Sequence, residues 1–198
     1  MSLEELVPEN TEGAASNTQS HSEFESMEEA ASFYQLARER LLNVNNWHQL
    51  AGKATAQFQL RDGNGNAVGR KARKGDYFQI DIPAPGSVTG DGCDWVKIED
   101  IREDENFLVI TVRPCSNPQN NKEDTAHFFS SDSSSSFLVK REGRKVTAGV
   151  HGRNEKPNAD ADKLVDKIRN TVVAIGAITG FSKLQWKSLV NGIVKKEE

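Results

Sequence analysis

The spacing of apolar residues changes twice along the chain, and each change marks a different kind of secondary structure. Apolar side chains recur at three- and four-residue steps over residues 23–43, which is typical of one face of an α-helix. Over residues 51–150 the period is two, and turn-forming residues separate the alternating segments, which indicates β-strands. Helical spacing returns over residues 161–195. This order of elements predicts a single α+β domain over residues 23–198.

The strands are expected to form one sheet. Most connections between them are short reversals, such as Glu142-Gly143, and short reversals join antiparallel neighbours. The segment 107–113 is apolar on both sides, which is typical of a central strand. We therefore expect a mostly antiparallel, curved sheet or open barrel of about seven strands. The expected strands cover residues 51–61, 77–82, 95–102, 107–113, 125–130, 137–141 and 145–150.

The C-terminal region is expected to be a helical hairpin that packs on this sheet together with the first helix. An apolar stripe predicts a helix over residues 161–179, and Gly180 is a common residue just past a helix end. Ser182 and Gln185 have the spacing of a capping box, which predicts a second helix over residues 182–195.

The same ending resembles a helix-turn-helix motif, in which the second helix enters the major groove of DNA. The side chains that would face the groove are Lys183, Gln185, Lys187, Ser188 and Asn191. Because the chain has a net charge of −4, nucleic acid is not its expected partner, and DNA binding is kept as a minor alternative.

The N-terminal segment 1–22 is expected to be a disordered acidic arm, because residues 8–22 are polar and contain no large apolar side chain. Residues 1–30 hold eight glutamates and no Lys, Arg or Asp, so this part carries −8 and the remainder +4. The arm could fold back onto the basic body, bind a basic partner or simply aid solubility.

Two cysteines, Cys93 and Cys115, are present, and they do not have the spacing of metal ligands. The start of the chain is acidic and has no apolar signal segment, and no run of residues is long and apolar enough to span a membrane. We therefore expect a cytoplasmic protein with no membrane segment, no metal and no cofactor.

The segment 151–158 follows directly on the last expected strand and is the candidate binding site. Five of its eight side chains can form directed hydrogen bonds, which is more than a simple loop requires. These are His151, Arg153, Asn154, Glu155 and Asn158. Arg153 could bind a carboxylate or phosphate through two parallel hydrogen bonds, with its neighbours adding further bonds. The alternative is a structural loop in which Glu155 pairs with Arg153 and the asparagines cap the following turn.

His127 is a second candidate, because it lies in the expected strand 125–130 on the same side as Thr125 and Phe129. A lone histidine among aromatic residues is ordinarily a hydrogen-bonded core residue. It could instead lie at the end of a concave surface that also holds Arg153 and Glu155.

The sequence contains no combination of residues that indicates catalysis: it lacks a nucleophile elbow, a phosphate-binding glycine loop and a zinc-protease helix. We therefore expect a non-enzymatic protein-interaction module, whose partner is another protein or a second copy of the chain. Its contacts would come from the acidic arm and from the segments 83–92, 114–124, 130–136 and 151–158.

The alternative function is a small-molecule-binding or catalytic curved-sheet domain with a site around His127, Arg153 and Glu155. A pocket of about 300 Å³ or more in which these side chains converge would favour a small molecule, and a flat surface would favour a protein partner.

Overall fold

The computed structural model describes residues 3–52, 56–82, 90–120, 123–158 and 171–196, and for residues 3–4 and 171–181 it describes the backbone alone. The expected α+β fold class is confirmed. Seven strands form one antiparallel sheet in the order β1-β7-β6-β5-β4-β3-β2. The strands are β1 (Ala14–Glu23), β2 (Gln57–Arg61), β3 (Tyr77–Asp81), β4 (Asp94–Asp104), β5 (Phe107–Pro114), β6 (Ser134–Glu142) and β7 (Lys145–Glu155).

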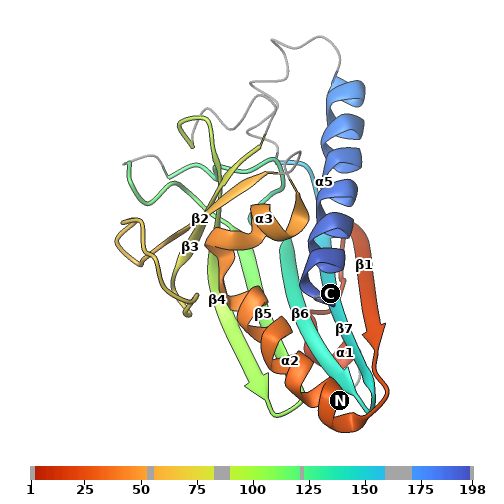
Figure 1. Ribbon diagram of the computed structural model, residues 1–198. Coiled ribbons are helices and arrows are strands. Elements are labelled where there is room, and N and C mark those ends of the chain that lie inside the picture. The colour runs from red at the N-terminus through yellow and green to blue at the C-terminus, as the bar shows by residue number, and fades with distance from the viewer. Residues whose placement is uncertain (1–2, 53–55, 83–89, 121–122, 159–170, 197–198) are drawn as a thin grey trace.

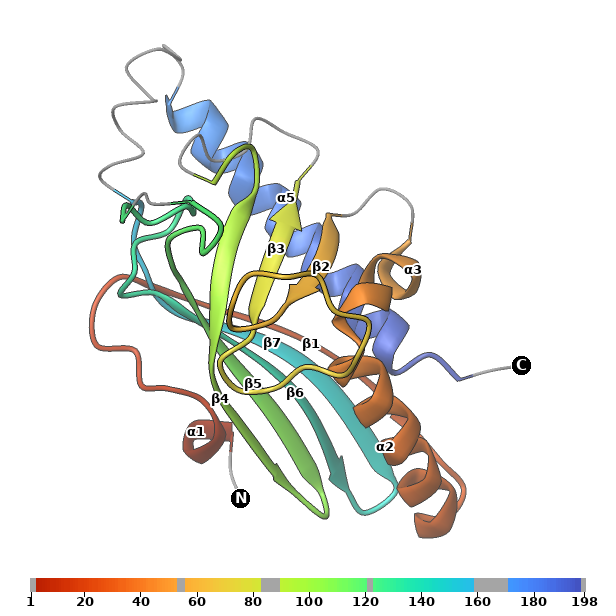
Figure 2. The ribbon, with the colours of Figure 1, turned by 90° about the vertical axis from the view of Figure 1, so that its left-hand side faces the viewer.

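The helices lie mainly on one side of this curved sheet (Figures 1 and 2). Ser26 caps the N-terminus of α2 by accepting a hydrogen bond of 3.1 Å from the backbone N–H of Glu29. Helix α2 packs on β6 and β7, while α5 follows β1 and contacts α3. The helices are α1 (Leu3–Leu6), α2 (Met27–Leu42), α3 (Trp47–Ala51) and α5 (Thr171–Ile193), and a 3₁₀ turn, η1 (Val44–Asn46), joins α2 to α3.

One cluster of buried residues joins α2, α3 and the last turns of α5 to the concave face of the sheet. Trp47 lies at its centre, fully buried, with its ring centroid 4.8–5.3 Å from the rings of Phe58, Phe78 and Phe137. The expected alternation explains the arrangement, since every second residue of the central strands points into this cluster.

The expectation of disorder over residues 1–22 was wrong for residues 14–22, which belong to the edge strand β1. This strand pairs with β7 along nearly its whole length, from Ala14 opposite Glu155 to Glu23 opposite Lys145. An edge strand can be held by backbone hydrogen bonds to one neighbour, so it needs no large apolar side chains of its own. The sheet therefore extends beyond the expected bounds of 51–150 at both ends.

The expected strand 125–130 is absent as a regular strand, and only an isolated bridge between Phe129 and Pro157 is formed there. The rings of His127, Phe128 and Phe129 contact one another, and this segment is not paired as a regular strand. The serine-rich segment 130–136, expected to be a loop, instead contributes its last three residues to β6.

The prediction of a C-terminal helical hairpin was also wrong, because α5 continues through Gly180 and Ser182 without a turn. Residues 161–170 of the expected first helix lie outside the described residues. A glycine inside a helix costs only about 1 kcal/mol, which the packing of a continuous helix outweighs. At the other end, Gly192 allows close approach to α3, since a Cβ atom there would overlap the carbonyl oxygen of Leu50.

A single helix removes the geometry on which the DNA-binding alternative rested. Gln185 is buried, and Lys187 Nζ donates a hydrogen bond to the backbone carbonyl of Gln19, so these two side chains do not face a groove. Within the described parts of the chain, no helix is both long and apolar enough to cross a membrane.

The N-terminal strap, residues 3–13, crosses the convex face of the sheet (Figure 2). Leu6 is buried against Val109 and Leu138, and Arg102 donates hydrogen bonds to the carbonyl oxygens of Glu5 and Leu6. Of the three alternatives for the acidic arm, folding back onto the body is the one that the structure contains.

Deletion of residues 1–12 is expected to lower the free energy of unfolding by only about 1–2 kcal/mol. The loss of buried area at Leu6 and Val7 is offset in part by the conformational entropy that the freed residues regain. Urea denaturation checks the value, and light scattering checks whether exposure of Val109 and Leu138 causes self-association. A loss of more than about 4 kcal/mol would contradict this estimate.

Candidate functional site

A pocket lies between α5 and the end of the sheet at which β7 finishes. Its volume is about 90 Å³. Because a water molecule needs about 10–15 Å³ of such space, the pocket has room for roughly six to nine waters, or for a small organic molecule. This volume is well below the roughly 300 Å³ at which a pocket favours a small-molecule ligand.

Apolar side chains make up most of the pocket wall. The ring centroids of Phe58 and Trp186 are 6.0 Å apart, and those of Phe128 and Phe129 are 4.3 Å apart. Ile80 of β3 adds an aliphatic surface. Such a wall gains free energy from the burial of an apolar ligand surface.

His127 lines this pocket, as the ligand-binding alternative expected, and its side chain is only 10% exposed. Its Nδ1 accepts a hydrogen bond of 2.9 Å from the backbone N–H of Phe129, so the proton of the neutral ring is on Nε2, which lies 4.0 Å from Asp94 Oδ2. Burial lowers the pKa of His127 from 6.5 to about 3, so the ring is neutral at physiological pH.

Glu155 reaches the same pocket from the end of β7. Ser16 Oγ donates a hydrogen bond of 2.7 Å to Glu155 Oε1. The carboxyl group lies over Gly152, where a Cβ atom would overlap it. Burial raises the pKa of Glu155 above its ordinary value, and this effect outweighs the opposing hydrogen bond from Ser16.

Gln185 is a polar pocket residue that the sequence analysis did not identify as ligand-binding. Its side chain is 3% exposed, and its Oε1 accepts a hydrogen bond of 2.6 Å from the backbone N–H of Ala56. This bond fixes the orientation of the amide, and Nε2 is then buried with no hydrogen-bond partner among the described residues. The sequence did hold a signal, since Gln185 is one helical turn before the buried Leu189.

The remaining candidates of the segment 151–158 do not converge on this pocket. His151 and Arg153 lie on the opposite, convex face, where both contact Asn17 Oδ1 at 2.7 and 3.0 Å. Arg153 also donates hydrogen bonds to the carbonyl oxygens of Ser16 and Gly152, so it is held by backbone and does not form an ion pair with Glu155.

The two asparagines of this segment stabilise neighbouring chain segments. Asn154 Oδ1 accepts hydrogen bonds from the backbone N–H groups of Thr11 and Glu12 in the strap. Asn158 Nδ2 donates to the carbonyl oxygens of Thr125 and His127, both at 3.0 Å. Asn158 therefore fixes the backbone that presents His127 to the pocket.

The described residues of the pocket do not form a recognisable catalytic arrangement. His127 is too weak a base at neutral pH to accept a proton readily, and its Nδ1 is already engaged. Among the residues that the structure describes, no cluster of three His, Cys, Asp or Glu side chains could hold a metal ion.

The chain matches no known family model and no curated protein. Among solved structures, the hypothetical protein jhp0584 of Helicobacter pylori is similar, with a TM-score of 0.52 and 10% identity over 96% of this chain and 93% of that one.

Truncated norcoclaurine synthase of Thalictrum flavum is more remote: its TM-score is 0.39 at 10% identity, over 96% of this chain and all of that one. For the major latex-like protein 151 of Panax ginseng the TM-score is 0.37 at 16% identity, over 79% and 95%. At these identities the likeness concerns the fold, and the function has to be argued from the pocket.

Proposed function

We propose that the chain binds a small organic molecule in the pocket between α5 and the sheet. The ligand has a compact apolar body and at least one hydrogen-bond acceptor, such as a carbonyl oxygen. The observation that carries the proposal is a largely apolar pocket lined by Gln185, whose buried Nε2 makes no hydrogen bond to any residue that the structure describes.

The free energy of hydrogen bonding supports this ligand chemistry. A buried donor without a partner costs about 1–3 kcal/mol, and an acceptor on the ligand would remove that cost. The apolar wall favours a ring or branched group, while neutral His127 adds no charge that the ligand would have to desolvate.

The segment 151–158, which was expected to contact a protein partner, is largely engaged within the chain. Residues 151–155 belong to β7, and the side chains of Arg153, Asn154 and Glu155 are engaged within the chain. Residues 83–89 and 121–122 of the loops that were to supply further contacts lie outside the described residues.

Benzamide and toluene test the proposal as matched probes, because both have one aromatic ring and benzamide adds a carbonyl acceptor. We expect Gln185→Met to weaken benzamide binding about tenfold, the loss that corresponds to one hydrogen bond, and to leave toluene binding nearly unchanged. Chemical-shift titration of the Trp186 indole N–H reports occupancy, since this residue lines the pocket.

The control is Gln57→Met, which removes an exposed carboxamide from β2 outside the pocket and should change neither affinity. Circular dichroism confirms that each variant is folded. The proposal is wrong if neither probe shifts the Trp186 signal at 10 mM in the folded wild type, or if Gln185→Met weakens both probes equally.

A further inference from the structure

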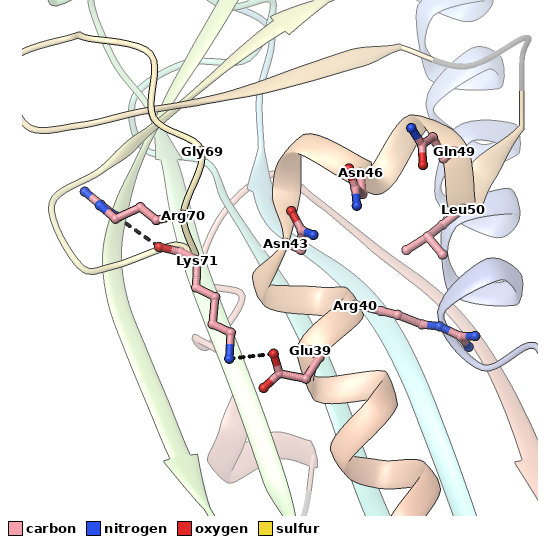
Figure 3. A pocket seen from close by; sticks show the side chains of 9 residues that line it. All are labelled: Glu39, Arg40, Asn43, Asn46, Gln49, Leu50, Gly69, Arg70 and Lys71. Atoms are coloured by element: carbon pink, nitrogen blue, oxygen red, sulfur yellow. Dashed lines mark hydrogen bonds and ion pairs between the residues drawn. The ribbon is translucent and has the colours of Figure 1, made fainter.

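A second and larger hollow lies beside α2 and α3 (Figure 3), and it shares no lining residue with the pocket of Gln185. Its volume is about 410 Å³, within the range of pockets that hold small ligands. One wall comes from the end of α2, from η1 and from α3, and the other from residues 69–71 between β2 and β3.

Three carboxamides follow one another along the helical wall. Asn43, Asn46 and Gln49 recur at three-residue steps, a spacing that places side chains on one face of consecutive helical turns. Their side chains neither donate to nor accept from any other described residue, although Asn43 and Asn46 make backbone hydrogen bonds. Each side chain therefore offers one acceptor oxygen and two donor hydrogens to whatever fills the hollow.

The charged groups around the hollow are, in contrast, engaged within the chain. Arg70 binds both carboxylate oxygens of the buried Asp76 at 2.6 and 2.9 Å. Lys71 Nζ lies 2.5 Å from Glu39 Oε2, and Figure 3 shows this pair at one side of the hollow. Arg40 donates to the carbonyl oxygens of residues 193 and 195, at 3.0 and 2.7 Å.

We propose that this hollow binds a neutral, hydroxyl-rich ligand, namely a sugar ring. A sugar hydroxyl is both a donor and an acceptor, as is a carboxamide, so neighbouring hydroxyls pair with consecutive carboxamides. Leu50 supplies an apolar surface for the C–H face of the ring, and Gly69 leaves the opposite wall without a side chain. An anionic ligand would have to break existing ion pairs before it gained new ones.

Titration of the 198-residue chain with a panel of neutral methyl glycosides and disaccharides tests this inference, with saturation-transfer NMR as the readout. We expect at least one of them to bind, and Asn46→Ala and Gln49→Ala each to weaken that binding about five- to tenfold, the effect of one lost hydrogen bond. Both side chains are exposed, so the variants should fold. Gln57→Ala, which removes an exposed carboxamide from β2, is the matched control and should leave the affinity unchanged.

Ionic strength provides a second check. Binding of a neutral sugar should be the same in 50 mM and 500 mM sodium chloride, whereas binding of an anion would weaken with salt. The inference is overturned if no neutral glycoside binds at 20 mM, if only sugar phosphates bind, or if the two variants bind as well as the control. Benzamide binding in the other pocket should be unaffected by these variants, so the two proposals fail independently.

Discussion

Trp47→Ala is expected to lower the free energy of unfolding by about 3–5 kcal/mol, the usual cost of replacing a large buried aromatic residue by alanine. The indole is fully buried and contacts the rings of Phe58, Phe78 and Phe137. Its Nε1–H also donates a hydrogen bond of 3.1 Å to the carbonyl oxygen of Leu41, near the end of α2. The variant thus leaves a cavity between helices and sheet and also an unpaired carbonyl.

Urea denaturation at neutral pH measures the loss, and Trp47→Phe separates its two sources. Phenylalanine retains most of the ring contacts but cannot donate to Leu41, so an intermediate loss is expected. A loss below about 1 kcal/mol for Trp47→Ala would show that Trp47 is not at the centre of the core.

The elements predicted most closely from the sequence were those whose side chains are divided between core and surface. In β2, Phe58 and Leu60 are buried while Gln57 and Gln59 are exposed, and the sequence shows the same alternation of apolar and polar residues. The central strand β5 was likewise recognised from its apolar residues on both sides, because both faces are covered.

The elements that were missed depend on backbone pairing or on packing between distant segments. Strand β1 has small polar side chains, and its only periodic signal is a hydroxyl group at every second residue: Ser16, Thr18, Ser20 and Ser22. At Ser182 a capping box predicted a helix start, but α5 runs through this residue. Capping contributes only about 1 kcal/mol, which is less than the packing free energy of a continuous helix.

The structure brings together two of the three residues that were expected around a ligand. His127 and Glu155 do share a pocket, but Arg153 lies on the other face of the sheet. The reason is a bulge near the end of β7: Asn154 has φ of 53°, and the register against β1 shifts between Ala14 and Ser16. An inserted residue reverses the alternation, which brings Glu155 to the concave face. A bulge of this kind has no reliable sequence signature.

Acidification is expected to destabilise the fold strongly, by about 4 kcal/mol between pH 7.5 and pH 5, through two buried histidines. Burial lowers the pKa of His127 to about 3, and burial with the nearby Arg153 lowers the pKa of His151 to about 4. In the unfolded chain both return to about 6.5.

The direction follows from where each state takes up protons. Above pH 6.5 both rings are neutral in the folded and the unfolded chain, so they do not change stability. As the pH falls below 6.5, the unfolded chain binds two protons that the folded chain cannot bind until the pH approaches 4 for His151 and 3 for His127. Because pH 5 lies about 1.5 units below the unfolded-state pKa of about 6.5, protonation of each ring stabilises the unfolded chain by about 2 kcal/mol at this pH.

Variants that retain the hydrogen bonds but cannot titrate isolate this effect. In His127→Asn the side-chain oxygen can accept the N–H of Phe129, and in His151→Asn the amide can donate to Asn17. The double variant should be somewhat less stable than the wild type at pH 7.5 but should lose about 4 kcal/mol less between pH 7.5 and pH 5. Glu155, whose pKa burial raises, acts in the opposite direction and does so equally in both proteins. Parallel loss of stability in the wild type and the double variant, measured by urea denaturation at half-unit steps of pH, would show that these two rings are not held in the neutral form by burial.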